Sequence, residues 1–184
     1  MTFHKLRIAA ICAGLLSLLI LVFSPPVRAQ PAGQLQLSCI GNATTYYSPG
    51  LLATPREIST TWTDNYTSCL PNASNIGSGV TNGSAVTTIS CTSLLGQQTA
   101  GSQRIDWNNN TYSIMSWAAN DVSITGTPAV QIYTVNATVT AGAFLGARVT
   151  EVIVLATPNL LGCLSEPGVI TTEGSITLLV QSLL

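Results

Sequence analysis

Residues 104–117 read RIDWNNNTYSIMSW and contain two strands with the turn between them. On either side of the three asparagines, apolar or aromatic side chains alternate with polar ones. This period-2 alternation is typical of a half-buried strand. The asparagines favour a tight hairpin turn, because asparagine tolerates the positive φ angles that such turns require. This segment predicts antiparallel β-structure.

The same alternation recurs along the chain from residue 35 onward. The sets of residues that share one strand face are Leu35, Leu37 and Cys39; Ile58, Trp62 and Tyr66; Ile89 and Cys91; and Ile176, Leu178 and Val180. Between Val130 and Val139 the apolar positions change parity, and a one-residue bulge near Tyr133 and Thr134 is expected to restore them. About eight such strands predict an all-β fold, either a two-sheet antiparallel β-sandwich (Ig-like or jelly-roll-like) or, as the alternative, a β-barrel.

The first 29 residues have the three regions of a secretion signal peptide. Residues 4–7 are a basic start, residues 8–23 are apolar, and Val27 and Ala29 are small residues at the two recognition positions. The apolar run is shorter than the roughly 20 residues that a membrane-spanning helix needs. We therefore expect cleavage after Ala29, which would leave residues 30–184 as one secreted domain that does not associate with the membrane.

Beyond residue 29 the chain contains no histidine and no lysine, and only three arginines against seven acidic residues. Without imidazole or amine groups, histidine-dependent nucleophilic catalysis, histidine-ligated metals and Schiff-base chemistry are excluded. So few basic residues also argue against nucleic acid and anionic membranes as partners. Residues 106–110 resemble the start of a calcium loop, but Thr111 and Trp117 stand where an EF-hand needs Gly and Glu. We predict no cofactor and no metal.

Four cysteines follow the leader, and an even number in an exported chain indicates two disulfides. Cys39 and Cys91 lie on apolar strand faces, whereas Cys69 and Cys163 lie in turn-like surroundings. Of the three pairings that four cysteines allow, we therefore expect Cys39–Cys91 and Cys69–Cys163.

Aromatic residues are the first candidates for ligand binding. Trp107 stands beside the hairpin tip and is expected to be exposed, whereas Trp62 and Trp117 are expected in the core. Tyr46 and Tyr47 are adjacent and point to opposite faces of an extended strand, so one of them should face solvent. We predict that Trp107, Tyr46 and Tyr47 contribute to a platform on which a sugar ring or a peptide stacks.

Carboxylates are the only acid–base groups left for catalysis. A glycosidase needs two of them about 5–5.5 Å apart for retention, or roughly 6.5–9.5 Å apart for inversion. No pair stands out among the seven, which are Glu57, Asp64, Asp106, Asp121, Glu151, Glu166 and Glu173. Glu151 interrupts an apolar strand, and we interpret it as an edge or solvent-facing charge paired with Arg104 or Arg148.

Five segments carry a resemblance to a known group of proteins: CIGNATTYYSPGL at 39–51, SCTSLL at 90–95, WNN at 107–109, VTAGAFLG at 139–146 and PNLLGC at 158–163. Together they resemble small exported all-β proteins of actinobacteria, a group without an assigned function. Asn110 departs from the pattern, in which a turn glycine is expected. The resemblance implies export and an all-β fold, and it carries no catalytic residue.

These observations predict a non-catalytic extracellular binding or interaction module, whose partner is a glycan or a protein. One alternative is a carboxylate-dependent polysaccharide hydrolase that uses two of the seven acids. A second alternative is a secreted enzyme inhibitor with a rigid loop near Cys69 or Cys163.

Overall fold

The structure is a computed structural model that describes residues 33–71, 75–92, 99–127, 129–156 and 160–183. The signal peptide expected at residues 1–29 lies outside these ranges and stays a prediction. The elements are β1 (Leu35–Leu51), β2 (Arg56–Leu70), β3 (Gly79–Ile89), β4 (Gly101–Trp107), β5 (Tyr112–Trp117), η2 (Ala119–Asp121), β6 (Val122–Thr127), β7 (Val130–Gly142), β8 (Arg148–Ala156), η3 (Leu160–Leu164) and β9 (Val169–Gln181). None of the described helical segments is long and apolar enough to cross a membrane.

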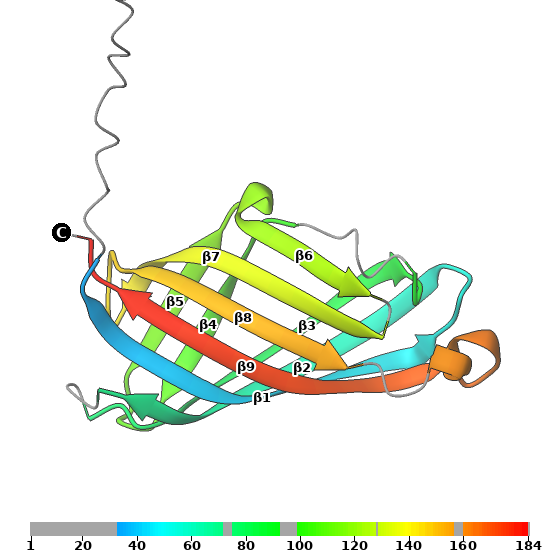
Figure 1. Cartoon of the computed structure of the whole chain (residues 1–184), viewed down its shortest axis with the longest axis horizontal. Helices are drawn as coiled ribbons and strands as arrows, with labels where there is room; N and C mark the ends of the chain where they lie inside the picture. Colours follow the sequence, from blue (N-terminus) through cyan, green and yellow to red (C-terminus); the bar gives the residue numbers. More distant parts are fainter. Residues whose placement is uncertain (1–32, 72–74, 93–98, 128, 157–159, 184) are drawn as a thin grey trace, which may run out of the picture. The chain divides into compact units, whose positions relative to one another are not determined.

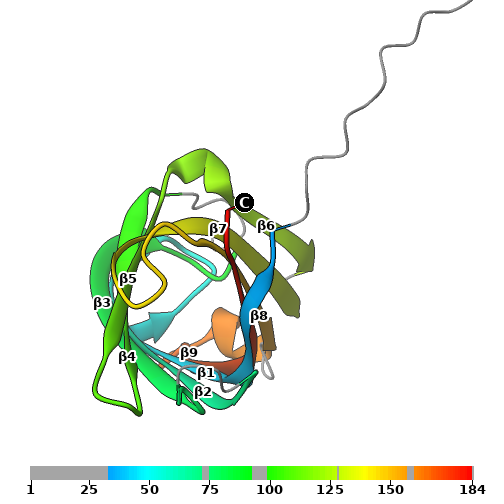
Figure 2. The ribbon, with the colours of Figure 1, turned by 90° about the vertical axis from the view of Figure 1, so that its left-hand side faces the viewer.

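The strands form one antiparallel sheet in the order β5-β4-β3-β2-β1-β9-β8-β7-β6, which closes on itself (Figures 1 and 2). Closure comes from the pairing of β5 with β7, in which Ser113 faces Gly142 and Ser116 faces Thr138. Eight strands complete the barrel, and β6 adds to the other half of the same β7 edge. The all-β prediction is confirmed. The two-sheet sandwich is wrong and the alternative barrel is correct, because all strands belong to one sheet that closes through the pairing of β5 with β7.

The predicted hairpin is confirmed. β4 pairs with β5 from Gly101 opposite Trp117 to Asp106 opposite Tyr112. Asn110 has a φ of 65°, and its backbone N–H donates to the Trp107 carbonyl at 3.1 Å. The turn forms because asparagine tolerates this left-handed backbone conformation.

One end of the barrel interior is tightly packed. The inward positions predicted for Leu37 and Cys39, for Tyr66, and for the last strand are confirmed there, whereas Leu35 is 46 % exposed. Its deeply buried residues include Leu37, Cys39, Tyr66, Ile76, Ile105, Met115, Ile176, Leu178 and Val180. A second, smaller cluster lies at the other end and consists of Tyr47, Leu51, Ile58, Ile89, Cys91, Cys163 and Val169.

Two disulfides are present, but not in the predicted pairs. Cys39 and Cys69 face each other across the β1–β2 ladder and are bonded, with their Cα atoms 4.0 Å apart. Cys91 follows β3 and is bonded to Cys163 in η3, with a Cα separation of 6.2 Å. The predicted Cys39–Cys91 and Cys69–Cys163 pairs are wrong, because Cys39 and Cys91 lie in the clusters at opposite ends of the interior.

The bulge predicted in β7 near Tyr133 and Thr134 is absent. The register of β7 with β8 is continuous through Tyr133 and Thr134. Gln131 is buried, and Tyr133 and Val135 follow it on the inward face, so Ile132 points outward. The parity change in the sequence therefore arises because polar side chains occupy inward positions along this half of β7.

Candidate functional site

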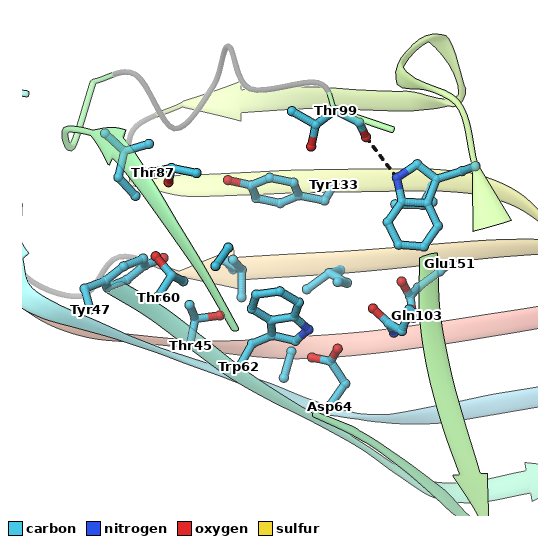
Figure 3. A pocket seen from close by; sticks show the side chains of 17 residues that line it. Thr45, Tyr47, Thr60, Trp62, Asp64, Thr87, Thr99, Gln103, Tyr133 and Glu151 are labelled. Carbon is cyan, nitrogen blue, oxygen red and sulfur yellow. Dashed lines mark hydrogen bonds between the residues drawn. The ribbon is translucent and has the colours of Figure 1, made fainter. Parts of the chain in front are cut away.

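A cavity of about 320 Å³ lies inside the barrel, between the two clusters (Figure 3). An eight-stranded barrel is just wide enough for large side chains to fill it. Here several inward positions of β1, β2 and β3 carry small side chains, and these leave space. They are Ala43, Thr45, Thr60, Ala85 and Thr87.

The cavity opens beside β3. Among the described residues, β3 and β4 pair at only two positions, Gly79 with Trp107 and Val80 with Asp106. Beyond these two pairs the described parts of β3 and β4 form no further ladder. Ala85, Thr87 and Thr99 line the cavity here and are exposed to solvent, so they form its mouth.

Two tryptophans form part of the cavity wall, each opposite a glycine of the neighbouring strand. Trp62 pairs with Gly83, and Trp117 pairs with Gly101. A Cβ atom on either glycine would overlap the indole that lies against it, so each ring rests on bare backbone. The Trp117 N–H also donates to the Thr99 carbonyl at 3.0 Å, which holds that ring at the mouth. Both tryptophans were expected in the core, but they are half-buried cavity residues.

Two carboxyl groups face the cavity. Asp64 on β2 is 3 % exposed, and Glu151 on β8 is 2 % exposed. Glu151 Oε1 accepts a hydrogen bond from the Tyr66 hydroxyl and a longer one, at 3.5 Å, from the Gln103 amide. Figure 3 shows Asp64, Gln103 and Glu151 on the same side of the cavity.

The solvent-facing position predicted for Glu151 is therefore wrong. Arg104, one of its two expected partners, instead forms an exposed ion pair with Asp106 at 2.7 Å. Arg148, the other, is exposed at the start of β8, and its side chain has the opposite strand parity to Glu151. The alternation of β8 places Glu151 inward together with Val149 and Leu155.

Burial changes the acidity of both carboxyls. It raises the pKa of Asp64 from 3.8 to about 7. It also raises the pKa of Glu151 from 4.5 to about 7, where the hydrogen bonds from Tyr66 and Gln103 act in the opposite direction and the charge of Asp64 raises the pKa further. Desolvation disfavours the charged form of a carboxyl, so both groups exchange protons near neutral pH.

The three residues predicted for ligand binding do not come together. Trp107 is 4 % exposed at the packed end, and its indole N–H donates to Ser113 Oγ at 2.9 Å, so its predicted exposure is wrong. Tyr46 is 56 % exposed on the outer surface, and Tyr47 faces inward, which confirms that one of the pair faces solvent. Only Tyr47 lines the cavity, where its hydroxyl is 3.2 Å from Thr172 Oγ1.

Sequence reasoning missed most of the cavity, although one signal was present. Thr60 and Asp64 have the same strand parity as Ile58, Trp62 and Tyr66, so their polar side chains had to point inward. The hydroxyl oxygen of Thr60 is buried and has no hydrogen-bond partner among the described residues. It lines the cavity, where a bound molecule could supply that partner.

The cavity can enclose a small, largely apolar molecule and offer it two carboxyls and the Thr60 hydroxyl. Comparison with known proteins identifies no relative, because no family model, no curated protein and no solved structure matches this chain.

Proposed function

We propose that this chain is a non-catalytic extracellular binding protein that holds a small, largely apolar molecule inside the barrel. The cavity of about 320 Å³ carries this proposal. Small-molecule sites are typically concave and lined by apolar and aromatic side chains, with a few convergent polar groups. This cavity has Trp62, Trp117 and Tyr133 in its wall, and its two carboxyls lie on one side together with the Gln103 amide.

Two features support a location outside the cytoplasm. The two disulfides are of the kind that persists in oxidising compartments. The first 29 residues have the pattern of a signal peptide. A ligand would therefore be taken up from the extracellular or periplasmic medium.

The geometry favours an internal ligand over the glycan or protein partner expected on an aromatic platform. Trp107 is buried, and Tyr46 and Tyr47 point to opposite sides of β1. Among the predicted residues, only Tyr47 belongs to the concave site.

The proposal can be tested with N-phenyl-1-naphthylamine, a neutral probe that fluoresces more strongly in apolar surroundings. Oxidised protein should saturate with the probe at one site per chain. Ala85→Trp places a large side chain in the mouth and should weaken binding at least about tenfold. Val86→Trp is the matched control, because Val86 is 64 % exposed and points away from the cavity, so binding should be unchanged. Folded wild-type protein that does not bind the probe would overturn the proposal.

A second candidate function rests on the two buried acids that share the cavity. A carboxylate-dependent hydrolase requires one protonated and one ionised carboxyl near the same bond. Asp64 and Glu151 meet the requirement for a shared site. Turnover of a panel of aryl glycosides that disappears in both Asp64→Asn and Glu151→Gln would support catalysis. No turnover by the wild-type protein would exclude it for these substrates.

A further inference from the structure

The cavity contains acidic groups but no basic group. None of the seventeen described residues that line it is arginine, lysine or histidine. Asp64 faces the cavity, is 3 % exposed, and forms no hydrogen bond or ion pair with any described residue. Burying a charge is unfavourable unless an opposite charge or hydrogen bonds compensate it. Above pH 7, where both carboxyls are largely ionised, the cavity therefore has a negative potential that no described basic residue compensates.

The arginines cannot supply the missing positive charge. Arg56 pairs with Glu166 at 2.6 Å, and Arg104 pairs with Asp106 on the outer surface. Arg148 is exposed on the outward face of β8. The other basic residues, His4, Lys5, Arg7 and Arg28, lie outside the described residues. When the two carboxyls are ionised, no described basic residue compensates their charge, so a cationic ligand is the group that could do so.

The aromatic residues of the cavity lie close to these acids. Trp62 comes from β2 two positions before Asp64, on the same face of the strand (Figure 3). Trp117, Tyr47 and Tyr133 complete the aromatic part of the wall. The face of an aromatic ring attracts a cation, most strongly in a site from which water is excluded. The ionised carboxyls and the aromatic faces thus both favour a positively charged ligand group.

We propose that the ligand is a small organic cation, an ammonium group carried on an apolar body, with the ammonium held at Asp64 and Glu151. This inference rests on the proposed function, because it specifies the ligand of the same cavity. The apolar body would lie against Trp62 and Trp117, towards the mouth beside β3. An anionic ligand would face repulsion from both ionised carboxyls, and a neutral one would gain no attraction from their charge.

The test uses three probes that share an eight-carbon chain and differ only in the head group: octylammonium, 1-octanol and octanoate. Each displaces N-phenyl-1-naphthylamine from oxidised protein at pH 8, where both carboxyls are ionised. Octylammonium should bind at least about tenfold more tightly than 1-octanol, and octanoate should bind most weakly. At pH 5 the preference for the cation should shrink, because both carboxyls are then protonated.

Three variants assign the effect to the two acids. Asp64→Asn and Glu151→Gln should each reduce the ratio between octylammonium and 1-octanol, and the double variant should bring it near one. Glu173→Gln removes an exposed carboxyl from the outer surface of β9 and should keep the wild-type ratio. All variants should still bind the neutral fluorescent probe, which shows that they are folded with the cavity intact.

The outcomes separate the two proposals. If the neutral probe does not bind, the cavity itself is not a ligand site and the proposed function fails. If the neutral probe binds but octylammonium is no better than 1-octanol at pH 8, only the cation assignment is overturned. A cation preference that persists in the double variant would also overturn it, because the charge would then act elsewhere.

Discussion

The two buried carboxyls should make the protein more stable at pH 5 than at pH 8. Burial raises the pKa of both Asp64 and Glu151 to about 7 in the folded state, against 3.8 and 4.5 for the unperturbed groups. Between these values the folded protein retains protons that the unfolded chain has released. The unfolding free energy therefore falls as pH rises from about 4. The stabilising contribution of these retained protons is complete at low pH, and it is lost once the pH exceeds the folded-state pKa.

The size of the effect follows from the two shifts. One pKa unit corresponds to about 1.4 kcal/mol. Between pH 5 and the folded-state pKa near 7, each carboxyl lowers the unfolding free energy by roughly 2 to 3 kcal/mol. This is a large share of the roughly 5 to 15 kcal/mol that stabilises a typical domain. The single histidine of the chain is His4, so no described imidazole titrates in the same range.

Urea denaturation of the oxidised protein at pH 5, 6, 7 and 8 measures the effect directly. The wild-type unfolding free energy should decrease across this series. Glu151→Gln should remove about half of the decrease, because one of the two titrating groups is gone. Glu173→Gln is the control and should follow the wild type, since Glu173 is exposed. A flat or rising wild-type profile, or a Glu151→Gln profile identical to it, would refute the assignment of these protons.

Other substitutions test individual contacts. Tyr66→Phe removes the hydroxyl that donates to Glu151, so the pKa of Glu151 rises further and the unfolding free energy should continue to fall to a higher pH than in the wild type. Gly83→Ala places a Cβ against the Trp62 indole and should destabilise by about 1 to 3 kcal/mol while weakening binding of the neutral probe. Cys91 and Cys163 form a disulfide between positions 72 residues apart. Replacing both with serine should lower the unfolding free energy by about 2 to 4 kcal/mol. Peptide mapping of the unreduced protein should recover the two bonded pairs seen here, and any other pairing would contradict the fold.

Local patterns in the sequence predicted the local structure well. The asparagine triplet of the β4–β5 hairpin and the buried face of Ile176, Leu178 and Val180 were both visible in the sequence. Closure of the barrel was not, because it depends on β5 pairing with β7, and no local pattern reports which distant strands become neighbours. The disulfide pairing failed for the same reason, since it depends on the β1–β2 register that places Cys39 opposite Cys69.

The cavity was missed because apolar residues were assumed to point inward. That rule holds at the packed end, where the interior is a close-packed core. Around the cavity it fails, since Asp64, Gln131 and Glu151 face inward while Ile132 faces outward. Two wrong predictions, the bulge in β7 and the solvent-facing position of Glu151 in β8, both arise because polar side chains face the interior here. Polar residues at inward parity on neighbouring strands were thus the sequence signal for an internal site.

The properties of the two acids link stability to binding. A barrel that required only stability would gain from apolar side chains at positions 64 and 151, because uncompensated buried carboxylates are unfavourable. Above pH 7 the folded protein instead carries these charges, and it is least stable where its attraction for a cation is greatest. A bound ammonium group would reverse that penalty, because a ligand that binds only the folded state adds to the unfolding free energy. It should therefore stabilise the protein more at pH 8 than at pH 5, whereas a neutral ligand that does not interact with the acids should stabilise it about equally at both. On the proposed function, the stability that the protein loses above pH 7 is regained when the cation binds.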